Sequence, residues 1–323
     1  MTDMYSSRLA AAIEELNALG PLKIIEQELL AKRTTWRVGG PADLWIAPET
    51  DFALVATVDC LNQHDIPWVI LGKGSNTLVC DGGFRGAVIN LERGLKQIEK
   101  TEWNNDECVV EAGAGVPLAA LLRFVSRQEI GGLEMLTGIP GTVGGAVRMN
   151  AGTHLGETKD SLIEARVMRN GKAPEWVNAD TLGLEYRNSN LGPRDIVLAA
   201  RFRGTREGGK DIAQVIKDVR ERRKATQPLT EASGGSTFAN PPEGKAWSFL
   251  EQAGMRGHRI GGAWFSELHA NFLIQGGDGT AQDIEDLIIL AKKEVHKQFG
   301  IKLREEVSRL ETGGWVKEEQ DGC

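Results

Sequence analysis

The spacing of apolar residues in the first 92 positions predicts alternating strands and helices. Apolar residues recur at helical spacing over 7–19, and Gly20-Pro21 ends that segment. The pattern then predicts a strand at 43–47, a helix at 51–64 after Thr50, and strands at 68–71, 78–79 and 86–91. Strand, helix and strand in this order indicate a βαβ unit with a right-handed crossover.

A second group of elements follows and has a different order. The pattern predicts a strand at 108–112, a helix at 117–128 with Pro117 in its first turn, and strands at 163–169, 176–177 and 196–202. Asn170-Gly171 is typical of a hairpin turn. These strands indicate a mixed α+β sheet.

The polar, glycine-containing segment 206–211 is the expected domain boundary. Beyond it the pattern predicts helices at 212–224, 248–253 and 281–299 and an alternating strand at 303–310. The sequence therefore predicts an α+β protein with a second, smaller domain.

Glycine is concentrated at 131–152, a stretch with neither helical nor strand periodicity. Two interpretations remain open: backbone N–H groups that approach a large anionic ligand, or a buried, glycine-packed crossover. Two more glycine turns, Gly72–Asn76 and Gly113–Gly115, each follow a predicted strand. They match neither the Walker pattern nor the full dinucleotide fingerprint. Three such turns together favour one phosphate-bearing ligand held by backbone N–H groups.

Composition narrows the function classes. The chain has 323 residues, 41% hydrophobic and 26% charged, so we expect two domains with a sizeable core. A net charge of −7 argues against a nucleic-acid partner. We expect a cytoplasmic protein, since the N-terminus lacks a basic signal region and there is no long apolar run. The four cysteines and five histidines show no metal spacing, so we expect no metal.

Three polar residues outside the glycine turns could carry chemistry. Arg187 could bind a carboxylate bidentately, but an ordinary surface arginine is the alternative. Ser236 lacks the surroundings of a hydrolase nucleophile, which leaves a proton donor or a turn serine. Alternation places one of Glu305 and Glu306 inward, where it could act in acid–base chemistry, or both could be charges on an edge strand.

Seven segments together resemble the UDP-N-acetylenolpyruvoylglucosamine reductases, the flavoenzymes of peptidoglycan precursor synthesis. In chain order they are TTWRVGGPADL, ILGKGSNTLV, GLEMLTGIPGTVGGAVRMNAG, EYRNSNL, GSTFANP, HANFLIQ with GTAQD, and FGIKLREEV. They span roughly residues 34–308 and are long and distinctive. The chain is similar to the form with the short substrate domain.

The resemblance implies a fold and a set of domains. It implies an α+β fold, with an FAD-binding portion of the vanillyl-oxidase type in two subdomains and a smaller α+β substrate-binding domain. The expected bounds are 1–206 for the FAD-binding portion (1–92 and 93–206), 207–300 for the substrate domain, 301–312 for a strand carrying Glu306, and 313–323 for a disordered tail.

The resemblance also implies roles for single residues. Arg187, Ser236 and Glu306 match catalytic positions, Ser236 as the proton donor. The implied FAD-binding residues are Arg37, Gly72, Lys73, Gly74, Ser75, Asn76, Gly113, Ala114, Gly115, Thr137, Gly138, Ile139, Pro140, Gly141, Gly144, Gly145, Asn150, Ala151 and Gly152. The implied substrate-binding residues are Tyr186, Arg223, Asn240, Lys245, His269 and Asn271.

The implied reaction is the NADPH-dependent reduction of an enolpyruvyl UDP-sugar through FAD, by a monomer or weak oligomer. An FAD-dependent oxidase of a small alcohol or sugar, and a nucleotide-binding module without chemistry, are the alternatives. One position departs from the family: Thr226 stands before Gln227-Pro228, where many relatives have Lys. Arg223 or Lys245 could then meet the substrate diphosphate.

Overall fold

A computed structural model describes residues 2–316 and divides the chain into two compact units. Unit 1 comprises Met1–Ile25, Leu44–Lys73 and Ala87–Arg223; unit 2 comprises Glu26–Asp43, Gly74–Gly86 and Lys224–Cys323. The units therefore do not follow the expected bounds. Unit 2 takes in two early segments, and the last division falls inside a helix rather than at 206–211. Thr77–Val79 pair with Ser308–Leu310, and the buried Trp36 indole donates to Leu273 O, so both early segments lie with the C-terminal part. Local sequence patterns do not reveal such long-range contacts.

The first sheet contains four strands in the order β1-β2-β5-β3. They are β1 (Leu22–Leu29), β2 (Pro41–Pro48), β5 (Phe84–Ile89) and β3 (Trp68–Ile70). Helix α2 (Asp51–Gln63) connects β2 to β3, and the Thr50 hydroxyl caps it by accepting from the Ala53 amide. The predicted strand–helix–strand order is present, but β5 lies between β2 and β3. Helix α1 (Thr2–Ala18) packs against α2.

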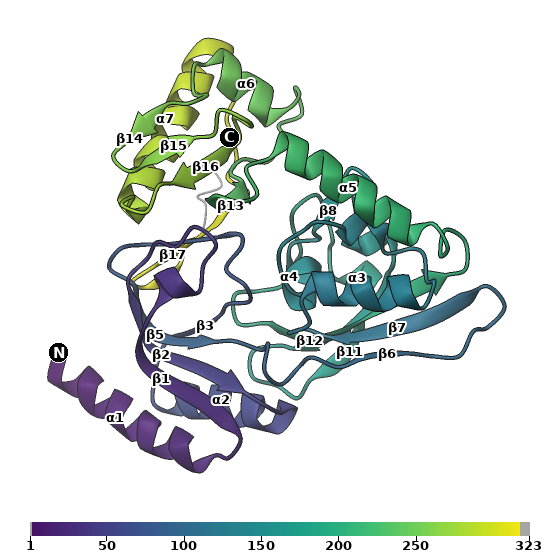
Figure 1. Ribbon diagram of the computed structural model, residues 1–323. Coiled ribbons are helices and arrows are strands. Elements are labelled where there is room, and N and C mark those ends of the chain that lie inside the picture. Colours follow the sequence, from purple (N-terminus) through teal and green to yellow (C-terminus); the bar gives the residue numbers. More distant parts are fainter. Residues whose placement is uncertain (1, 317–323) are drawn as a thin grey trace. The chain divides into compact units, whose positions relative to one another are not determined.

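The second sheet lies wholly in unit 1 and has the order β11-β10-β12-β7-β6 (Figure 1). Its strands are β6 (Ile98–Lys100), β7 (Glu107–Gly113), β10 (Leu162–Met168), β11 (Glu175–Asn178) and β12 (Ile196–Thr205). Asn170 and Gly171 both have positive φ in the turn between the antiparallel strands β10 and β11, so the hairpin prediction is confirmed. The mixed α+β prediction also agrees with this sheet and its helices.

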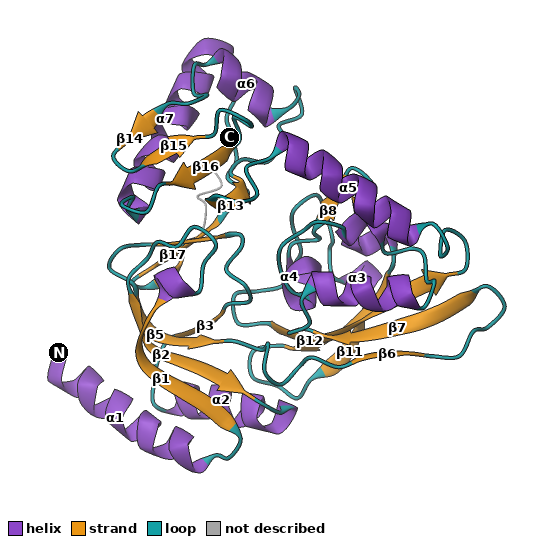
Figure 2. Ribbon diagram, viewed as in Figure 1, coloured by secondary structure: helices purple, strands orange, loops and turns teal. Residues whose placement is uncertain are grey.

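Short helices cover this sheet and carry the glycine-rich stretch. They are α3 (Leu118–Arg127) and α4 (Val143–Arg148), with the 3₁₀ turns η2 (Glu134–Leu136), η3 (Thr158–Asp160) and η4 (Ala179–Thr181). Strands β8 (Gly152–Thr153) and β9 (Gly156–Glu157) form a small hairpin after α4. Figure 2 shows α3 as a helix along this part of unit 1.

Unit 2 contains a four-stranded sheet with the order β13-β16-β15-β14. The strands are β13 (Ala232–Ser236), β14 (Arg259–Ile260), β15 (Ala263–Phe265) and β16 (Phe272–Gln275). Its helices are α6 (Ala246–Gln252) and α7 (Ala281–Phe299), while α5 (Ile212–Thr226) crosses the unit boundary. The predicted bounds of α7 are confirmed, because Thr280 and Asp283 form a capping box and Gly300 ends the helix at φ +71°.

A smaller sheet in unit 2 corrects two expectations. It has the order β18-β17-β4, with β4 (Thr77–Val79), β17 (Ser308–Glu311) and β18 (Gly314–Trp315). The 3₁₀ turn η1 (Leu30–Lys32) directly follows β1 in the sequence. Strand β17 begins at Ser308 rather than 303, because the preceding residues make single contacts instead of a ladder. Strand β18 lies where the disordered tail was expected to start, and 317–323 fall outside the described residues. No helix within 2–316 is long and apolar enough to span a bilayer.

Candidate active site

Gly72 of the first glycine turn and the second and third turns lie close together in unit 1. A Cβ on Gly72 would lie 2.9 Å from the Thr142 hydroxyl, and one on Gly144 would lie 3.0 Å from the Ala114 Cβ. The Val143 amide donates to the Val116 carbonyl at 2.9 Å. The second and third turns are therefore joined, and Gly72 borders the third. Here the glycines permit approach between backbone segments.

The amides of these turns do not all face outward. In the second turn they donate to carbonyls within unit 1: Gly113 to Gln97, Ala114 to Leu198 and Gly115 to Leu95. The Gly144 amide donates to Ala114 O, and the Gly145 amide to the Thr142 hydroxyl. These donors are therefore already used within the protein, which argues against a grip on a ligand by the backbone N–H groups of these residues. The amides of Gly72 and Lys73 have no backbone acceptor within residues 2–316.

Thr137 adds an unused polar group to the same unit. It is fully buried, and its hydroxyl has no protein hydrogen-bond partner among the described residues. A buried polar atom of this kind points to a ligand or water, because leaving it unpaired costs about 1–3 kcal/mol. Gly138 follows at φ +76°, and a Cβ there would lie 2.7 Å from an Arg223 guanidinium nitrogen. Burial lowers the pKa of Arg223.

The loop that begins at Thr137 and Gly138 continues through Ile139, Pro140 and Gly141. The Gly141 carbonyl accepts from the Leu118 amide at the start of α3, and Ile139 packs partly buried against the core of unit 1. Lys73 forms an ion pair with Glu92 at 3.4 Å. The loop is therefore fixed to the sheet through α3.

Arg187 lies in a tight loop of unit 1 and has a strained backbone. Its φ is +57°, and the amides and carbonyls of Glu185 and Asn188 bond to each other across it, both at 3.1 Å. For a non-glycine residue this region costs on the order of 1–3 kcal/mol and is typical of functional sites. The guanidinium donates to Gly152 O at 2.9 Å and lies 5.1 Å from the Tyr186 ring centre.

Ser236 and Glu306 are brought together within unit 2. The Glu306 amide donates to Thr237 O at 2.8 Å, directly after Ser236 at the end of β13. Asn76 fixes the other side, since its Nδ2 donates to Glu306 O at 2.9 Å and its carbonyl accepts from Ser308. The Thr237 hydroxyl is buried without a protein partner among the described residues. Sequence reasoning did not select Thr237, and its position beside Ser236 is the signal that could have found it.

Of the two adjacent glutamates, Glu305 is the inward one. Its side chain is 2% exposed and pairs with Lys292 at 3.1 Å and with Arg309 at 3.2 Å. Glu306 is half-buried and lies on the opposite side of the backbone by alternation. An ion-paired Glu305 thus anchors the segment, and Glu306 is the one whose backbone is held beside Thr237.

Two expected substrate ligands, Asn271 and Asn240, also have structural partners. Asn271 is buried, its amide donates to Phe238 O at 2.8 Å, and its Oδ1 accepts from the Phe238 amide at 2.9 Å. Asn240 Oδ1 accepts from the Ala246 amide at the start of α6. The Asn271 side chain therefore holds the backbone of Phe238, two residues after Ser236, and Asn240 helps to position the start of α6.

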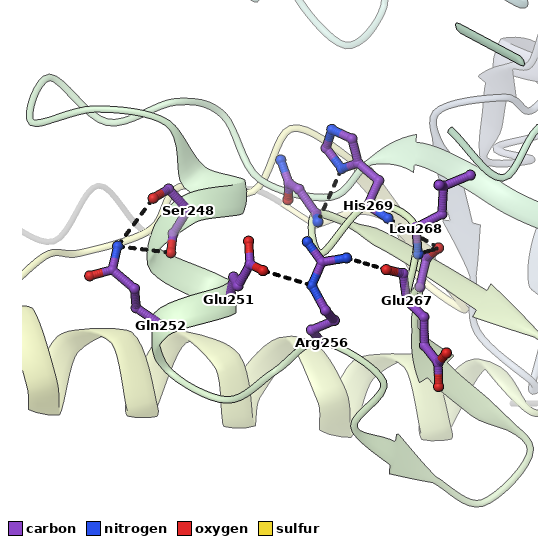
Figure 3. Close-up of polar contacts among 9 residues, drawn as sticks. Ser248, Glu251, Gln252, Arg256, Glu267, Leu268 and His269 are labelled. Atoms are coloured by element: carbon purple, nitrogen blue, oxygen red, sulfur yellow. Dashed lines mark hydrogen bonds and ion pairs between the residues drawn. The ribbon is translucent and has the colours of Figure 1, made fainter. Parts of the chain in front are cut away.

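His269 is one of the residues whose polar contacts are drawn in Figure 3. Its Nδ1 accepts from the Asn271 amide at 3.3 Å, so the proton of the neutral ring is on Nε2. Burial, with a contribution from the positive Arg256, lowers the pKa of His269. Arg256 itself lies between Glu251, at 3.0 Å, and the Glu267 carbonyl. A neutral His269 could donate one hydrogen bond to a ligand.

Arg37 and Lys245 are exposed cations of unit 2. Arg37 has φ +60° and follows Trp36, which is fully buried and donates to Leu273 O at 2.9 Å. Trp36 also covers Gly234 on β13, where a Cβ would lie 2.6 Å from the ring. The sequence analysis did not select Trp36, which holds this segment against β13 and Leu273. Lys245 immediately precedes α6.

The described residues also place Glu15, Cys60 and His64 together between α1 and α2. His64 Nε2 lies 2.9 Å from Glu15, and burial with the nearby Glu15 charge raises the pKa of the Cys60 thiol to about 11. The sequence showed no such cluster, because the residues come from two helices. A protonated thiol beside a His64–Glu15 hydrogen bond is consistent with helix packing.

Comparison with known families covers most of the chain. The model of an FAD binding domain matches residues 42–172, and the model of the C-terminal domain of UDP-N-acetylenolpyruvoylglucosamine reductase matches 227–310. These two ranges agree with an FAD-binding portion followed by a smaller domain.

Individual relatives carry the same name. UDP-N-acetylenolpyruvoylglucosamine reductase of Bacillus velezensis is 37% identical over 91% of this chain and 96% of its own length. The enzyme of Phenylobacterium zucineum is 42% identical over 89% and 95%. The crystal structure of UDP-N-acetylenolpyruvylglucosamine reductase from Thermus caldophilus has a TM-score of 0.72 at 32% identity, covering 89% of this chain and 98% of that one.

Proposed function

The chain belongs to the UDP-N-acetylenolpyruvoylglucosamine reductase family, and from that premise we propose that it reduces the enolpyruvyl ether of UDP-N-acetylglucosamine to UDP-N-acetylmuramate with FAD and NADPH. The observation that carries this function is similarity along nearly the whole of both chains, in sequence and in fold. It supports the reductase and gives no support to the oxidase alternative.

The residues of unit 1 fit FAD. The amides of Gly72 and Lys73 have no backbone acceptor among the described residues, and the Thr137 hydroxyl is buried without a protein partner there. Backbone amides suit a pyrophosphate, because they donate hydrogen bonds without requiring a basic protein. We assign the first turn and the loop from Thr137 to Gly141 to the cofactor, and the second turn to the support behind them.

The side chains then act on the substrate. FAD, when bound, supplies the hydride that NADPH provides. Arg187 binds the substrate carboxylate bidentately and withdraws electron density from the double bond. Glu306, in its protonated form, donates a hydrogen bond to the developing enolate. Ser236 donates its hydroxyl proton to the carbon next to the one that receives the hydride, and it regains a proton from solvent.

We assign the substrate diphosphate to Lys245 rather than Arg223. Lys245 is exposed in unit 2, whereas the Arg223 guanidinium packs against Gly138 in unit 1. Because a lysine presents a compact charge to a phosphate, Lys245→Met should raise the KM for the UDP-sugar with little change in kcat.

We further propose that the protein acts in the cytoplasm, as a monomer or weak oligomer. Its UDP-sugar product belongs to peptidoglycan precursor synthesis, through which it would affect cell-wall formation, cell shape and division.

A pair of half-reactions tests the proposed roles. Ser236→Ala should retain flavin reduction by NADPH and lose product formation, because only the protonation step needs the hydroxyl. The matched control is Ser248→Ala on α6, whose hydroxyl bonds Gln252 (Figure 3). It should keep both half-reactions. Loss of both half-reactions in Ser236→Ala would make Ser236 a structural residue and contradict the assignment.

A further inference from the structure

The loop that carries Arg187 is held by several groups of unit 1. Arg187 has φ +57°, a conformation that persists only when its surroundings impose it. The guanidinium is held by Gly152 O at 2.9 Å. The backbone of the loop is closed by the paired Glu185 and Asn188, and Ser189 Oγ joins it to α4 by donating to Arg148 O at 2.6 Å.

Asn150, just after the end of α4, provides a second anchor, at Glu185 on the other side of Arg187. It has φ +41°, its amide donates to Val147 O at 3.1 Å, and the Ala151 amide donates to Ala146 O at 2.9 Å. This is the Schellman arrangement, in which the left-handed position favours Gly or Asn. Glycine at position 150 would satisfy this backbone conformation equally well, so the conformation alone does not explain why the residue is Asn.

The Asn150 side chain makes three hydrogen bonds, although it is fully buried. Its Nδ2 donates to Glu185 O and to Glu157 Oε2, both at 2.9 Å, and its Oδ1 accepts from the Lys159 amide at 2.9 Å. An amide nitrogen has two donors, and both are used. The expectation that Asn150 binds FAD is therefore replaced by a contact with the Arg187 loop.

We propose that Asn150 is a positioning residue for Arg187. By fixing Glu185 O, its amide sets the direction in which the strained Arg187 projects. Its own side chain does not touch the substrate. This inference rests on the proposed role of Arg187 in polarising the substrate carboxylate.

Two substitutions at Asn150 and one control test the proposal. Asn150→Asp keeps size, the left-handed preference and the acceptor but removes both donors, to Glu185 O and to Glu157 Oε2. Asn150→Gly keeps the backbone conformation and removes the whole side chain. Asn190→Asp is the matched control: Asn190 lies in the same connection and is exposed, and its amide donates to Thr181 O at 2.8 Å instead.

Both Asn150 variants should bind FAD and be reduced by NADPH at rates within about twofold of the wild type. Their reoxidation by the UDP-sugar should slow by about 10- to 100-fold, because small misplacements of a reacting group have effects of that size. Asn190→Asp should match the wild type in both half-reactions.

The double variant Asn150→Asp/Arg187→Ala shows whether Asn150 acts through Arg187. It should be no slower than Arg187→Ala alone, since the guanidinium that Asn150 positions is already gone. Additive losses would overturn the proposal, as would wild-type reoxidation in Asn150→Gly. Loss of FAD from Asn150→Asp, measured by the flavin absorbance that remains after gel filtration, would restore the cofactor role and overturn it too. If Arg187→Ala alone reoxidises normally, the proposed function of Arg187 fails instead.

Discussion

Replacing Glu305 by Gln removes a buried negative charge that faces two cations in unit 2. Glu305 lies 3.1 Å from Lys292 and 3.2 Å from Arg309, and its side chain is 2% exposed. Gln keeps the size of the side chain but leaves both cations without their shared carboxylate. We expect Glu305→Gln to destabilise the protein.

The size of the effect follows from the exposure of the partners. Breaking a buried ion pair by removing one partner costs about 3–5 kcal/mol. Lys292 is 39% exposed and can turn to water, and Arg309 keeps Glu285 at 2.5 Å. We therefore expect the lower end, about 3 kcal/mol, which corresponds to a fall in melting temperature of roughly 4–5 °C for a chain of 323 residues.

Scanning calorimetry of the flavin-loaded protein measures this shift. The control is Lys297→Met, which removes an exposed partner 4.0 Å from Glu294 on α7. An exposed pair contributes about 0–1 kcal/mol, so the control should melt within about 2 °C of the wild type. A Glu305→Gln protein that melts with the control would refute the assignment of Glu305 as an anchor.

Three further outcomes are expected. Burial lowers the pKa of His269, so the contribution of His269 to stability is present above about pH 6.5 and falls as the pH drops below that value. The melting temperatures of the wild type and of His269→Gln, measured between pH 5 and 8, should therefore approach each other as the pH is lowered. A difference that stays constant with pH would contradict this. Thr280→Ala should lose the cap of α7 and about 1 kcal/mol of unfolding free energy, which urea titration measures. Gly115→Ala should cost about 1–3 kcal/mol by overpacking against the Leu91 carbonyl, and an unchanged melting temperature would exclude that contact.

Local signals predicted individual elements well where the determinants lie close in sequence. Thr280 and Gly300 delimit α7, and the Asn170-Gly171 turn joins β10 to β11. The alternation at 303–310 correctly indicated that one of Glu305 and Glu306 faces inward, but it extended the strand too far, because pairing with β4 begins only at Ser308. The start of β17 is thus set by distant segments.

Motifs nominated the candidate site residues, and for several of them the structure shows hydrogen-bond partners that the motifs do not reveal. Glycines in the second turn suggested exposed amides, but Gly115 donates to Leu95 O, a partner far enough away that spacing does not indicate it. Likewise, Asn150 and Asn271 match motif positions, yet their amides bind protein backbone. Motifs identify which residues matter; hydrogen-bond partners decide what each one does.

The central claim is that NADPH and the enolpyruvyl UDP-sugar react in two successive steps through bound FAD. Anaerobic absorbance titration tests it most directly. We expect NADPH to bleach the flavin band, and the enolpyruvyl UDP-sugar, added next without oxygen, to restore it with formation of a product heavier by two hydrogen atoms. A flavin that stays oxidised with NADPH, or one that recovers its colour only when air is admitted, would contradict the account.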